Sequence, residues 1–443
     1  MARFGIVGGG MLGMTLAWRF AQSGHDVVIF ESAERCGGLA APWRLGEITW
    51  DRHYHVILNS DQALLSLLDE IALTADLRWA TTRTGFFVDG RMHSLSNVAE
   101  FLRFPPLSLI EKGRLAATIL AASRITDGEP LEHLTAVEWL TKYSGRNTVE
   151  KLWLPLLRAK LGTYAEQASA AFIWTIIARM YRARSSSAKR EQLGYVQGGY
   201  DRVLERFEAQ LKQVGVDIRC SSRVQTVERR GAAIAVTSDS GEERFDAIAV
   251  TLAAPLAARI CPSLTAQERA ACMGVQYQGI VCASLLTDTP LTPFYITNIT
   301  DQRLPFTAVI EMSALVDRAS FGGRSLIYLP KYAPATDPLF AAPDQECESV
   351  FLSALERMHP HFSRRQVRAF RVSRAPFVMP VPTLDYSMRL PPVRTQTPGL
   401  YLANSAHIVN GTLNVNETVT LANAAANTVM RDYAGFSTIG VAV

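Results

Sequence analysis

The sequence predicts an α/β protein in which two domains are interleaved, and three observations support this class. An apolar run at 3–7 passes through a glycine-rich turn into a stretch with helical periodicity, 11–21, and a second apolar run occupies 27–30. Helical patterns dominate 95–193. Short β-like runs follow at 279–286, 307–310 and 325–329. We therefore expect a Rossmann-like domain joined to a substrate domain that consists of a mixed β-sheet and a helical cap.

The first turn carries three glycines, Gly8, Gly10 and Gly13. Gly8 permits the tight turn, Gly10 lets the backbone approach phosphates, and Gly13 lets the helix pack on the strand. The unpaired N–H groups at the helix start, including those of Met11 and Leu12, add partial positive charge. This turn predicts a site for the pyrophosphate of a dinucleotide.

The second apolar run ends in Glu31, whose carboxylate is placed to accept hydrogen bonds from a ribose, with Ser32 beside it. A simple NAD domain would continue directly into another helix, but a second glycine turn intervenes here. Paired glycines bring backbone close to a ligand, and an arginine can present several donors to phosphate oxygens. This order favours FAD over NAD, with an ordinary turn as the alternative. The expected contacts of the second turn are Arg35, Gly37, Gly38, Leu39 and Ala40.

These motifs resemble the N-terminal fingerprint of the FAD-containing superfamily of amine oxidases, phytoene-type desaturases and protoporphyrinogen oxidases, and more distantly of UDP-galactopyranose mutase. Segments 194–224 and 399–417 extend the resemblance over the whole chain. The resemblance implies that Val224 contacts the adenine region. It also implies that Asn404, where many relatives carry an aspartate, lies near the ribityl chain or the pyrophosphate.

The same resemblance implies a domain organisation in which a GR2-type FAD-binding domain is assembled from separate segments. The segments expected to bind FAD are 1–94, 194–256 and 386–443. Between them, 95–193 is expected to form the helical cap and 257–385 the substrate-domain sheet.

The closing motif, Asn414, Val415 and Asn416, precedes an alanine-rich helical stretch, and Asn416 is a natural N-cap for it. The positive end of such a helix would stabilise the negative charge of a reduced flavin. The chain has no cysteine between Gly399 and Met430, so we expect noncovalent FAD.

The amino-acid composition limits the classes of molecule that we expect the protein to bind. The 443 residues carry a formal net charge of +4, with 48% hydrophobic and 19% charged residues, which is typical of a globular protein and not of a nucleic-acid reader. Six scattered cysteines without zinc-like spacing suit a reducing compartment, and no metal site is predicted. No apolar run is long enough to span a bilayer. We expect a cytoplasmic protein that binds a small molecule and no nucleic acid, and the oligomeric state stays open.

The catalytic candidates are Arg52, His53 and His55, which follow the second glycine turn closely. In an extended chain the two histidines would face one side, where they could polarise a substrate oxygen, accept a proton or bind flavin edges. The alternative is structural, with one histidine satisfied by backbone and the other solvated. A His-x-aromatic-His element also resembles the mutase branch.

The cap contains cations that could hold an anionic group. Arg158 and Lys160 either serve this role or lie at the surface. Residues 179–190 form a basic stretch with three serines, which is either a solvated linker or a site for phosphate or lipid headgroups. Together with the amphipathic 101–125 region, this stretch allows peripheral membrane contact, although the same apolar stripe would also suit a core.

We therefore predict an FAD-dependent oxidoreductase, a dehydrogenase, desaturase or oxidase, that accepts hydride at flavin N5 from a largely apolar organic substrate, which can be cyclic. One alternative is a mutase-like flavoenzyme that uses reduced FAD on a sugar nucleotide. A second is an amine oxidase, although 407–413 lacks the aromatic residues that many amine oxidases carry there. A third is a flavoprotein without catalytic activity. Lys331 is either a flavin-side lysine or an exposed lysine at a strand end.

Overall fold

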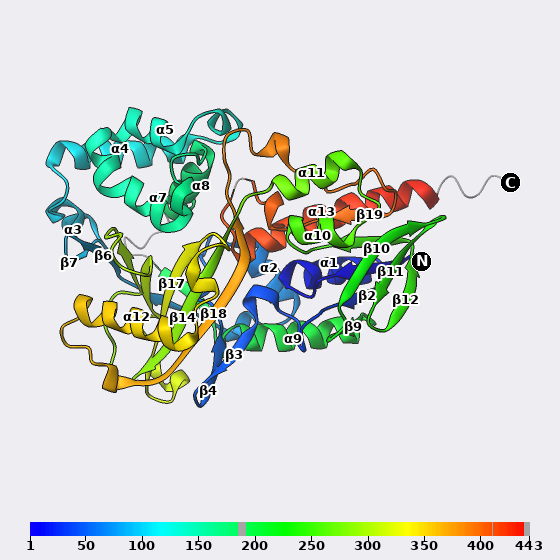
Figure 1. The fold of residues 1–443 in the computed structure, drawn as a ribbon, viewed down its shortest axis with the longest axis horizontal. Coiled ribbons are helices and arrows are strands. Elements are labelled where there is room, and N and C mark those ends of the chain that lie inside the picture. Colours follow the sequence, from blue (N-terminus) through cyan, green and yellow to red (C-terminus); the bar gives the residue numbers. More distant parts are fainter. Residues whose placement is uncertain (185–191, 410, 438–443) are drawn as a thin grey trace.

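The structure, a computed structural model, describes residues 1–184, 192–409 and 411–437. Within these ranges the chain forms a five-stranded parallel sheet and a seven-stranded mixed sheet, besides smaller antiparallel pairs. Figure 1 shows a group of helices from the first half of the chain standing over the seven-stranded sheet, at the end of the molecule opposite the C-terminus. The predicted α/β class with a mixed sheet is confirmed.

The five-stranded sheet takes its strands from distant parts of the chain. In spatial order these are β19 (Leu400–Leu402), β13 (Ala247–Val250), β1 (Arg3–Val7), β2 (Asp26–Phe30) and β9 (Asp217–Arg219). The inner strands are largely apolar on both sides because both faces are covered, whereas the edge strand β9 carries Asp217 and Arg219. Phe4 and Ile6 belong to one core and Val7 to another.

Helices cover the first face of this sheet. The long helix α13 packs directly on α1, so the end of the chain lies against its beginning (Figure 1). The helices of this layer are α1 (Met11–Gln22), α2 (Gln62–Glu70), α9 (Gly199–Gln213) and α13 (Val415–Ser437).

An antiparallel sheet and two short helices cover the second face. The sheet consists of β10 (Val224–Arg230), β11 (Ala233–Ser238) and β12 (Gly241–Phe245). The helices are α10 (Ala254–Ile260) and α11 (Ala266–Gly274). Helix α11 starts with a capping box between Thr265 and Glu268.

The seven-stranded sheet separates two environments. Its order is β18 (Val367–Pro380), β14 (Tyr277–Thr287), β17 (Ser325–Ala333), β16 (Ala308–Glu311), β15 (Ile296–Ile299), β6 (Thr84–Val88) and β7 (Arg91–Ser94). Residues alternate between its faces. Ile327 and Leu329 of β17 pack with α12 (Asp344–Met358), whereas Leu326 and Tyr328 face the hairpin of β3 (Pro42–Leu45) and β4 (Ile48–Asp51).

The cap consists of helices with strong start signals. Ser108 with Glu111 and Thr135 with Glu138 form capping boxes at two of them. Pro155 lies in the first turn of another, where proline is tolerated, directly after a π-helical segment at Val149–Trp153. The cap helices are α3 (Val98–Arg103), α4 (Leu109–Arg124), α5 (Ala136–Ser144), α6 (Arg146–Thr148), α7 (Leu154–Leu161) and α8 (Ala170–Arg184).

Two parts of the chain pack with the other domain than the one expected from their position in the sequence. Strands β6 and β7 fall within 1–94 but pair into the seven-stranded sheet, because β6 finds a parallel partner in β15. Helix α11 falls within 257–385 but packs on the parallel sheet through Cys272. Strands β5 (Leu77–Thr81) and β8 (Gln192–Val196) form a separate antiparallel pair.

Membrane spanning was assessed over the described ranges. Every helix there is too short or too polar to cross a bilayer.

Candidate functional site

The two glycine turns lie against each other. The Gly37 N–H donates to the Gly9 carbonyl at 2.8 Å, and Gly10 and Gly37 form an isolated parallel bridge. A Cβ on Gly38 would lie 3.2 Å from the Gly10 Cα, and a Cβ on Gly13 would lie 1.9 Å from the Gly8 oxygen. The backbones approach so closely that side chains have no room, as a cradle for a phosphate-bearing ligand requires.

The start of α1 offers free donors beside this cradle. Gly10 is the N-cap residue and gives no side-chain hydrogen bond, and the first turn holds no acidic residue. The N–H groups of Met11, Leu12 and Gly13 therefore lack the partner that a capping side chain would provide. Such a terminus attracts an anion.

Glu31 holds the first turn in shape. One carboxylate oxygen accepts the Gly9 N–H at 2.7 Å, and the other accepts the Ala33 N–H at 2.8 Å and faces the Ser32 hydroxyl at 3.3 Å. The Glu31 carbonyl accepts the Ser222 N–H at 2.8 Å, which brings the buried start of β10, Val224, towards the same corner. The predicted ribose and adenine residues thus converge from distant segments.

The residues of the second glycine turn differ from one another in burial and in their partners. Ala40 is buried, and the Gly38 and Leu39 carbonyls receive hydrogen bonds from neighbouring side chains. Arg35 forms an ion pair with Asp201 of α9 at 2.9 Å, and half of its side chain is exposed. In this structure the Arg35 guanidinium therefore binds the Asp201 carboxylate.

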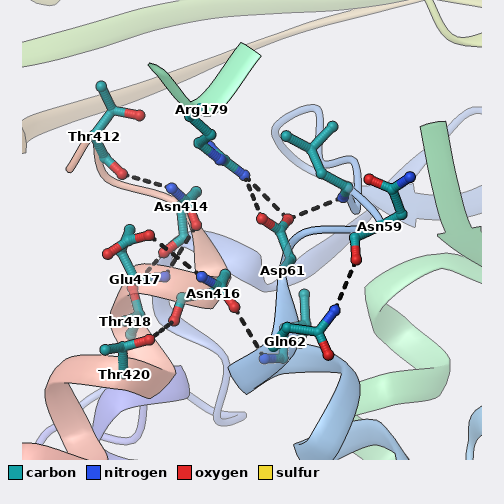
Figure 2. Close-up of polar contacts among 12 residues, drawn as sticks. Asn59, Asp61, Gln62, Arg179, Thr412, Asn414, Asn416, Glu417, Thr418 and Thr420 are labelled. Carbon is teal, nitrogen blue, oxygen red and sulfur yellow. Dashed lines mark hydrogen bonds and ion pairs between the residues drawn. The ribbon is translucent and has the colours of Figure 1, made fainter. Parts of the chain in front are cut away.

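The closing motif corrects one expectation. Asn414, not Asn416, caps α13, because its side chain accepts the Glu417 N–H at 3.0 Å and the helix begins at Val415. The Asn416 side-chain oxygen instead accepts the Leu64 N–H at 3.1 Å and joins the first turns of α13 and α2 (Figure 2). Both positions carry asparagine with similar flanks, so sequence alone could not separate the roles.

Asn404 is a buried polar residue whose side chain has a hydrogen-bond donor without a protein acceptor. Its oxygen accepts the Ala406 N–H at 3.1 Å, but its side-chain nitrogen is buried without a hydrogen-bond partner. A buried, unsatisfied amide donor is costly unless a ligand accepts from it.

Arg52 and His53 support the second glycine turn. The Arg52 guanidinium donates to the Gly38 carbonyl at 2.7 Å. His53 donates from Nδ1 to the Leu39 carbonyl at 3.1 Å and accepts from the Ser373 hydroxyl at Nε2, also at 3.1 Å. Burial lowers the pKa of His53 to about 3, so the ring is neutral. Both ring nitrogens have protein partners, which agrees with the structural alternative for this residue.

His55 has a different environment, so the expectation of a shared face is wrong. Strand β4 ends at Asp51, and the chain beyond it is not a strand, so period-two alternation does not apply. His55 stacks on Tyr200 at 4.7 Å between ring centroids, and its Nδ1 lies 3.6 Å from the Asp51 carboxylate. That distance is too long for a hydrogen bond. His55 keeps a ring nitrogen available for a ligand.

Asp51 has a role that sequence reasoning did not assign. Its carboxylate accepts the Tyr200 N–H at 2.7 Å and so caps α9 from outside the helix. A Cβ on Gly199 would lie 2.8 Å from the same carboxylate oxygen. The glycine pair before Tyr200 is the only sequence signal for this close approach.

Sequence reasoning also missed two hydroxyl groups on the inner face of the seven-stranded sheet. The Tyr54 and Tyr332 hydroxyls are 3.0 Å apart, and burial raises the pKa of both. The Tyr328 hydroxyl donates to the Asp51 carbonyl at 2.6 Å. Tyr332 and Lys331 point to opposite faces of β17, and Lys331 pairs with Asp337 at 3.0 Å. Lys331 therefore faces away from the hydroxyl pair and is engaged by a carboxylate, which agrees with the alternative of a lysine at a strand end.

The cap contributes charge to the same region. Arg179 of α8 binds both carboxylate oxygens of the buried Asp61 at 3.0 Å, and Figure 2 shows this pair beside the first turn of α13. Lys160 of α7 lies 5.7 Å from the centre of the Tyr332 ring. Arg158 instead pairs with Glu166 at the surface. Residues 185–190 of the predicted basic stretch, including Lys189 and Arg190, lie outside the described residues, as do the side chains of Arg182 and Arg184.

The cysteines differ from one another in their surroundings. None of the six, all of which lie in described ranges, forms a disulfide, and all but Cys220 are buried. Cys36 and Cys220 are hydrogen-bonded neighbours although 184 residues separate them (220 − 36), and burial raises the pKa of both thiols. The Cys36 sulfur lies against the first glycine turn, where it leaves no room for a Cβ on Gly9.

Comparison with protein families gives a match over nearly the whole chain. The family model described as flavin-containing amine oxidoreductase matches residues 12–430. The fold is similar to that of a crystallised protein from Exiguobacterium that is assigned as a protoporphyrinogen oxidase. That similarity has a TM-score of 0.78 at 21% identity and covers 97% of this chain and 99% of the other.

Curated relatives match over shorter regions. The chain is 26% identical over 266 residues to a protein of Mycobacterium tuberculosis assigned as a flavin-containing monoamine oxidase, a match that covers 56% of each chain. It is 26% identical over 212 residues to a zeta-carotene desaturase from Synechocystis, a match that covers 42% of each. The chain therefore matches about half the length of these relatives.

Proposed function

The chain belongs to the family of flavin-containing amine oxidoreductases, and from this premise we propose that it is a cytoplasmic FAD-dependent oxidoreductase, a dehydrogenase, desaturase or oxidase. Its substrate in this proposal is a small, largely apolar organic molecule, which can be cyclic. When bound, the flavin supplies an acceptor at N5 for a hydride from that substrate. Family membership confirms the predicted flavin cofactor, FAD, and the resemblance stated from the sequence.

The residues present fit such a cofactor. The glycine turns leave a cradle without side chains, and the start of α1 leaves backbone donors without a capping partner. The buried Asn404 amide nitrogen has no protein acceptor. Each of these features is costly in an empty protein and is satisfied by a ligand with phosphates and hydroxyl groups.

We assign the cofactor contacts accordingly. Gly8, Gly10, Met11, Leu12 and Gly13 would bind the pyrophosphate through backbone N–H groups. Glu31 would accept from the adenosine ribose, with Ser32 and Val224 beside the adenosine. The remaining contacts would come from Arg35, Gly37, Gly38, Leu39, Ala40, Asn404, Asn414, Val415 and Asn416.

Arg52 and His53 act in this proposal as positioning residues. They hold the Gly38 and Leu39 carbonyls, and the neutral His53 ring keeps one proton on Nδ1 for that purpose. His55, with a free ring nitrogen and the Asp51 carboxylate behind it, is the better candidate to hold or move a proton at the substrate.

The observation that carries the substrate class is the inner face of the seven-stranded sheet. Ile280 and Cys282 of β14 lie there with Tyr328 and Tyr332 of β17, and burial keeps the tyrosines protonated. Such a face excludes water and binds apolar groups, with the hydroxyls as polar exceptions.

Charge argues against an amine as the substrate. Among the described residues of the cap, Lys160 and Arg179 are cations of this region, and Asp61 compensates only the second of them. A protonated amine would be repelled at this side. One alternative, a mutase-like enzyme, would need Arg179 to leave Asp61, so that it and Lys160 could both bind the diphosphate of a sugar nucleotide.

We further propose that the cap contacts the surface of an anionic membrane. Val98, Leu109 and Ile110 are each about three-quarters exposed, on helices at the outer edge of the molecule (Figure 1). Arg103 and Arg114 are exposed beside them, whereas the nearby Glu111 is engaged with Ser108 and Lys151. An apolar face with basic flanks fits a bilayer interface that carries anionic headgroups.

Anaerobic mixing of the FAD-loaded protein with candidate substrates tests the function. Stoichiometric loss of the oxidised-flavin absorbance on addition of an apolar substrate is the expected result. Turnover of a sugar nucleotide only after reduction by dithionite would support the mutase alternative instead. Bleaching by primary amines in preference to uncharged or acidic compounds would overturn the substrate class.

A further inference from the structure

Two cations on α7 have opposite surroundings although they are two residues apart. Arg158 lies at the surface and pairs with Glu166 at 2.6 Å. Lys160 is partly buried where α7 packs against β17, and its ammonium group lies 5.7 Å from the centre of the Tyr332 ring. The helix thus directs one cation outward and holds the other against the inner face of the sheet.

The charge of Lys160 is not compensated. Across the part of the chain that the structure describes, no carboxylate forms an ion pair with it, and it makes no hydrogen bond. Asp61, the acid of this region, is engaged by Arg179 through both oxygens and also accepts the Leu58 N–H at 2.9 Å. The three charged groups together leave one positive charge.

An isolated cation in such a position is unfavourable. Burial, together with the smaller effect of the Arg179 charge, lowers the pKa of Lys160 to about 8. Ammonium groups that are withdrawn from water are normally paired with an anion. The Tyr332 hydroxyl and the Tyr54 hydroxyl, which lies 3.0 Å from it, stay neutral because burial raises the pKa of both, and they can donate hydrogen bonds.

We propose that Lys160 binds a carboxylate on an otherwise apolar substrate, with the Tyr54–Tyr332 hydroxyl pair as a neighbouring donor. This inference rests on the proposed function and specifies its substrate class as an apolar carboxylic acid. A single uncompensated charge matches a carboxylate better than the several charges of a diphosphate. Lys160 is then a residue that determines specificity, and it takes no part in the proton transfer assigned to His55.

Titration calorimetry on the FAD-loaded protein tests the proposal without turnover. The probes are dodecanoate, dodecanol, dodecylamine and UDP, each below its aggregation limit. We expect dodecanoate to bind about tenfold more tightly than dodecanol, and Lys160→Met to remove this preference. Lys331→Met is the matched control, because that lysine pairs with Asp337 on the opposite face and should leave dodecanoate binding unchanged.

The pH dependence separates charge from shape. In the wild type, dodecanoate affinity should fall above about pH 8 as Lys160 loses its proton, while the Tyr54 and Tyr332 hydroxyls stay protonated because burial raises their pKa. Lys160→Arg should retain the affinity and lose this fall, since arginine stays charged.

Two results would overturn the proposal. Equal binding of dodecanoate and dodecanol would show that the cation has no role in recognition. Loss of UDP binding in Lys160→Met with unchanged dodecanoate binding would assign the residue to phosphate. Neither result affects the flavin-bleaching experiment, which tests the proposed oxidoreductase function independently.

Discussion

The cofactor cradle and the space under the cap are built in different ways. In the cradle, backbone geometry makes the site: Gly9 contacts Gly37, and Gly13 packs on Gly8, within the first 40 residues. Under the cap, side chains make it: Lys160, Arg179, Asp61, Tyr54 and Tyr332 come from separate elements. The cradle needs glycines at fixed spacing, whereas the cap region needs only that certain charges and hydroxyls meet.

This difference indicates which part of the molecule can change its specificity without loss of the fold. A cradle of backbone donors tolerates few substitutions, because a Cβ at its centre would collide with backbone. A set of side chains can change one member at a time without loss of the fold. Family membership therefore determines the cofactor, and in our proposal the charge under the cap determines which substrates fit.

The largest expected effect lies in the cradle, at Glu31. Glu31→Ala removes the acceptor of the Gly9 and Ala33 N–H groups and the proposed partner of the ribose. We expect FAD affinity to fall about 100-fold, or about 3 kcal/mol, because charge-assisted hydrogen bonds are lost. Ultrafiltration with fluorescence detection of released FAD measures this change.

Glu34→Ala is the matched control, because it removes the same charge from an exposed position three residues away. It should leave FAD affinity within about twofold of the wild type. If Glu31→Ala kept full affinity, the cradle would not depend on this carboxylate, and the contrast between the two regions would be weaker than we argue.

Sequence could predict the cradle because its signals are local. The glycine turns and Glu31 are adjacent in sequence to β1, α1 and β2, so spacing alone locates them. The capping asparagine was misplaced by two residues because Asn414 and Asn416 both precede the same helical pattern. The conformation of the preceding loop determines which of the two asparagines binds the free N–H at the start of the helix.

The region under the cap could not be predicted in the same way. Lys160 and Arg158 have equivalent sequence surroundings, and only packing of α7 against β17 separates them. Lys331 was a candidate for the flavin side, but the register of β17 turns Tyr332 inward and Lys331 outward. An extended chain would place His53 and His55 on one side, but strand β4 ends at Asp51, before both histidines.

His53 lies on the border between the two regions and gives the second prediction. Its pKa is about 3 in the folded protein and 6.5 in the unfolded chain, so the unfolded state binds a proton first as the pH falls. Stability from this residue is complete above about pH 6.5 and is lost progressively as the pH falls towards 3. From pH 7 to pH 5 we expect the wild type to lose about 2 kcal/mol more than His53→Gln.

Urea unfolding at these two pH values measures the difference. Ser373→Ala is the companion variant, because it removes one hydrogen bond to the ring but keeps the buried, titratable imidazole. It should remain acid-sensitive. Equal acid sensitivity in the wild type and in His53→Gln would show that the ring is not held neutral, and would return it to the catalytic candidates.

The smallest expected effect concerns the outer surface of the cap, where side chains again decide the outcome. Leu109→Glu with Ile110→Glu replaces two exposed apolar side chains by acids, and should lower binding to vesicles that contain phosphatidylglycerol about tenfold, because both insertion and attraction are lost. Val350→Glu, on an exposed position of α12, is the matched control and should bind like the wild type. Sedimentation with vesicles measures the bound fraction. Equal losses in both variants would mean that net charge alone drives binding, and absence of binding by the wild type would remove the membrane from the proposal.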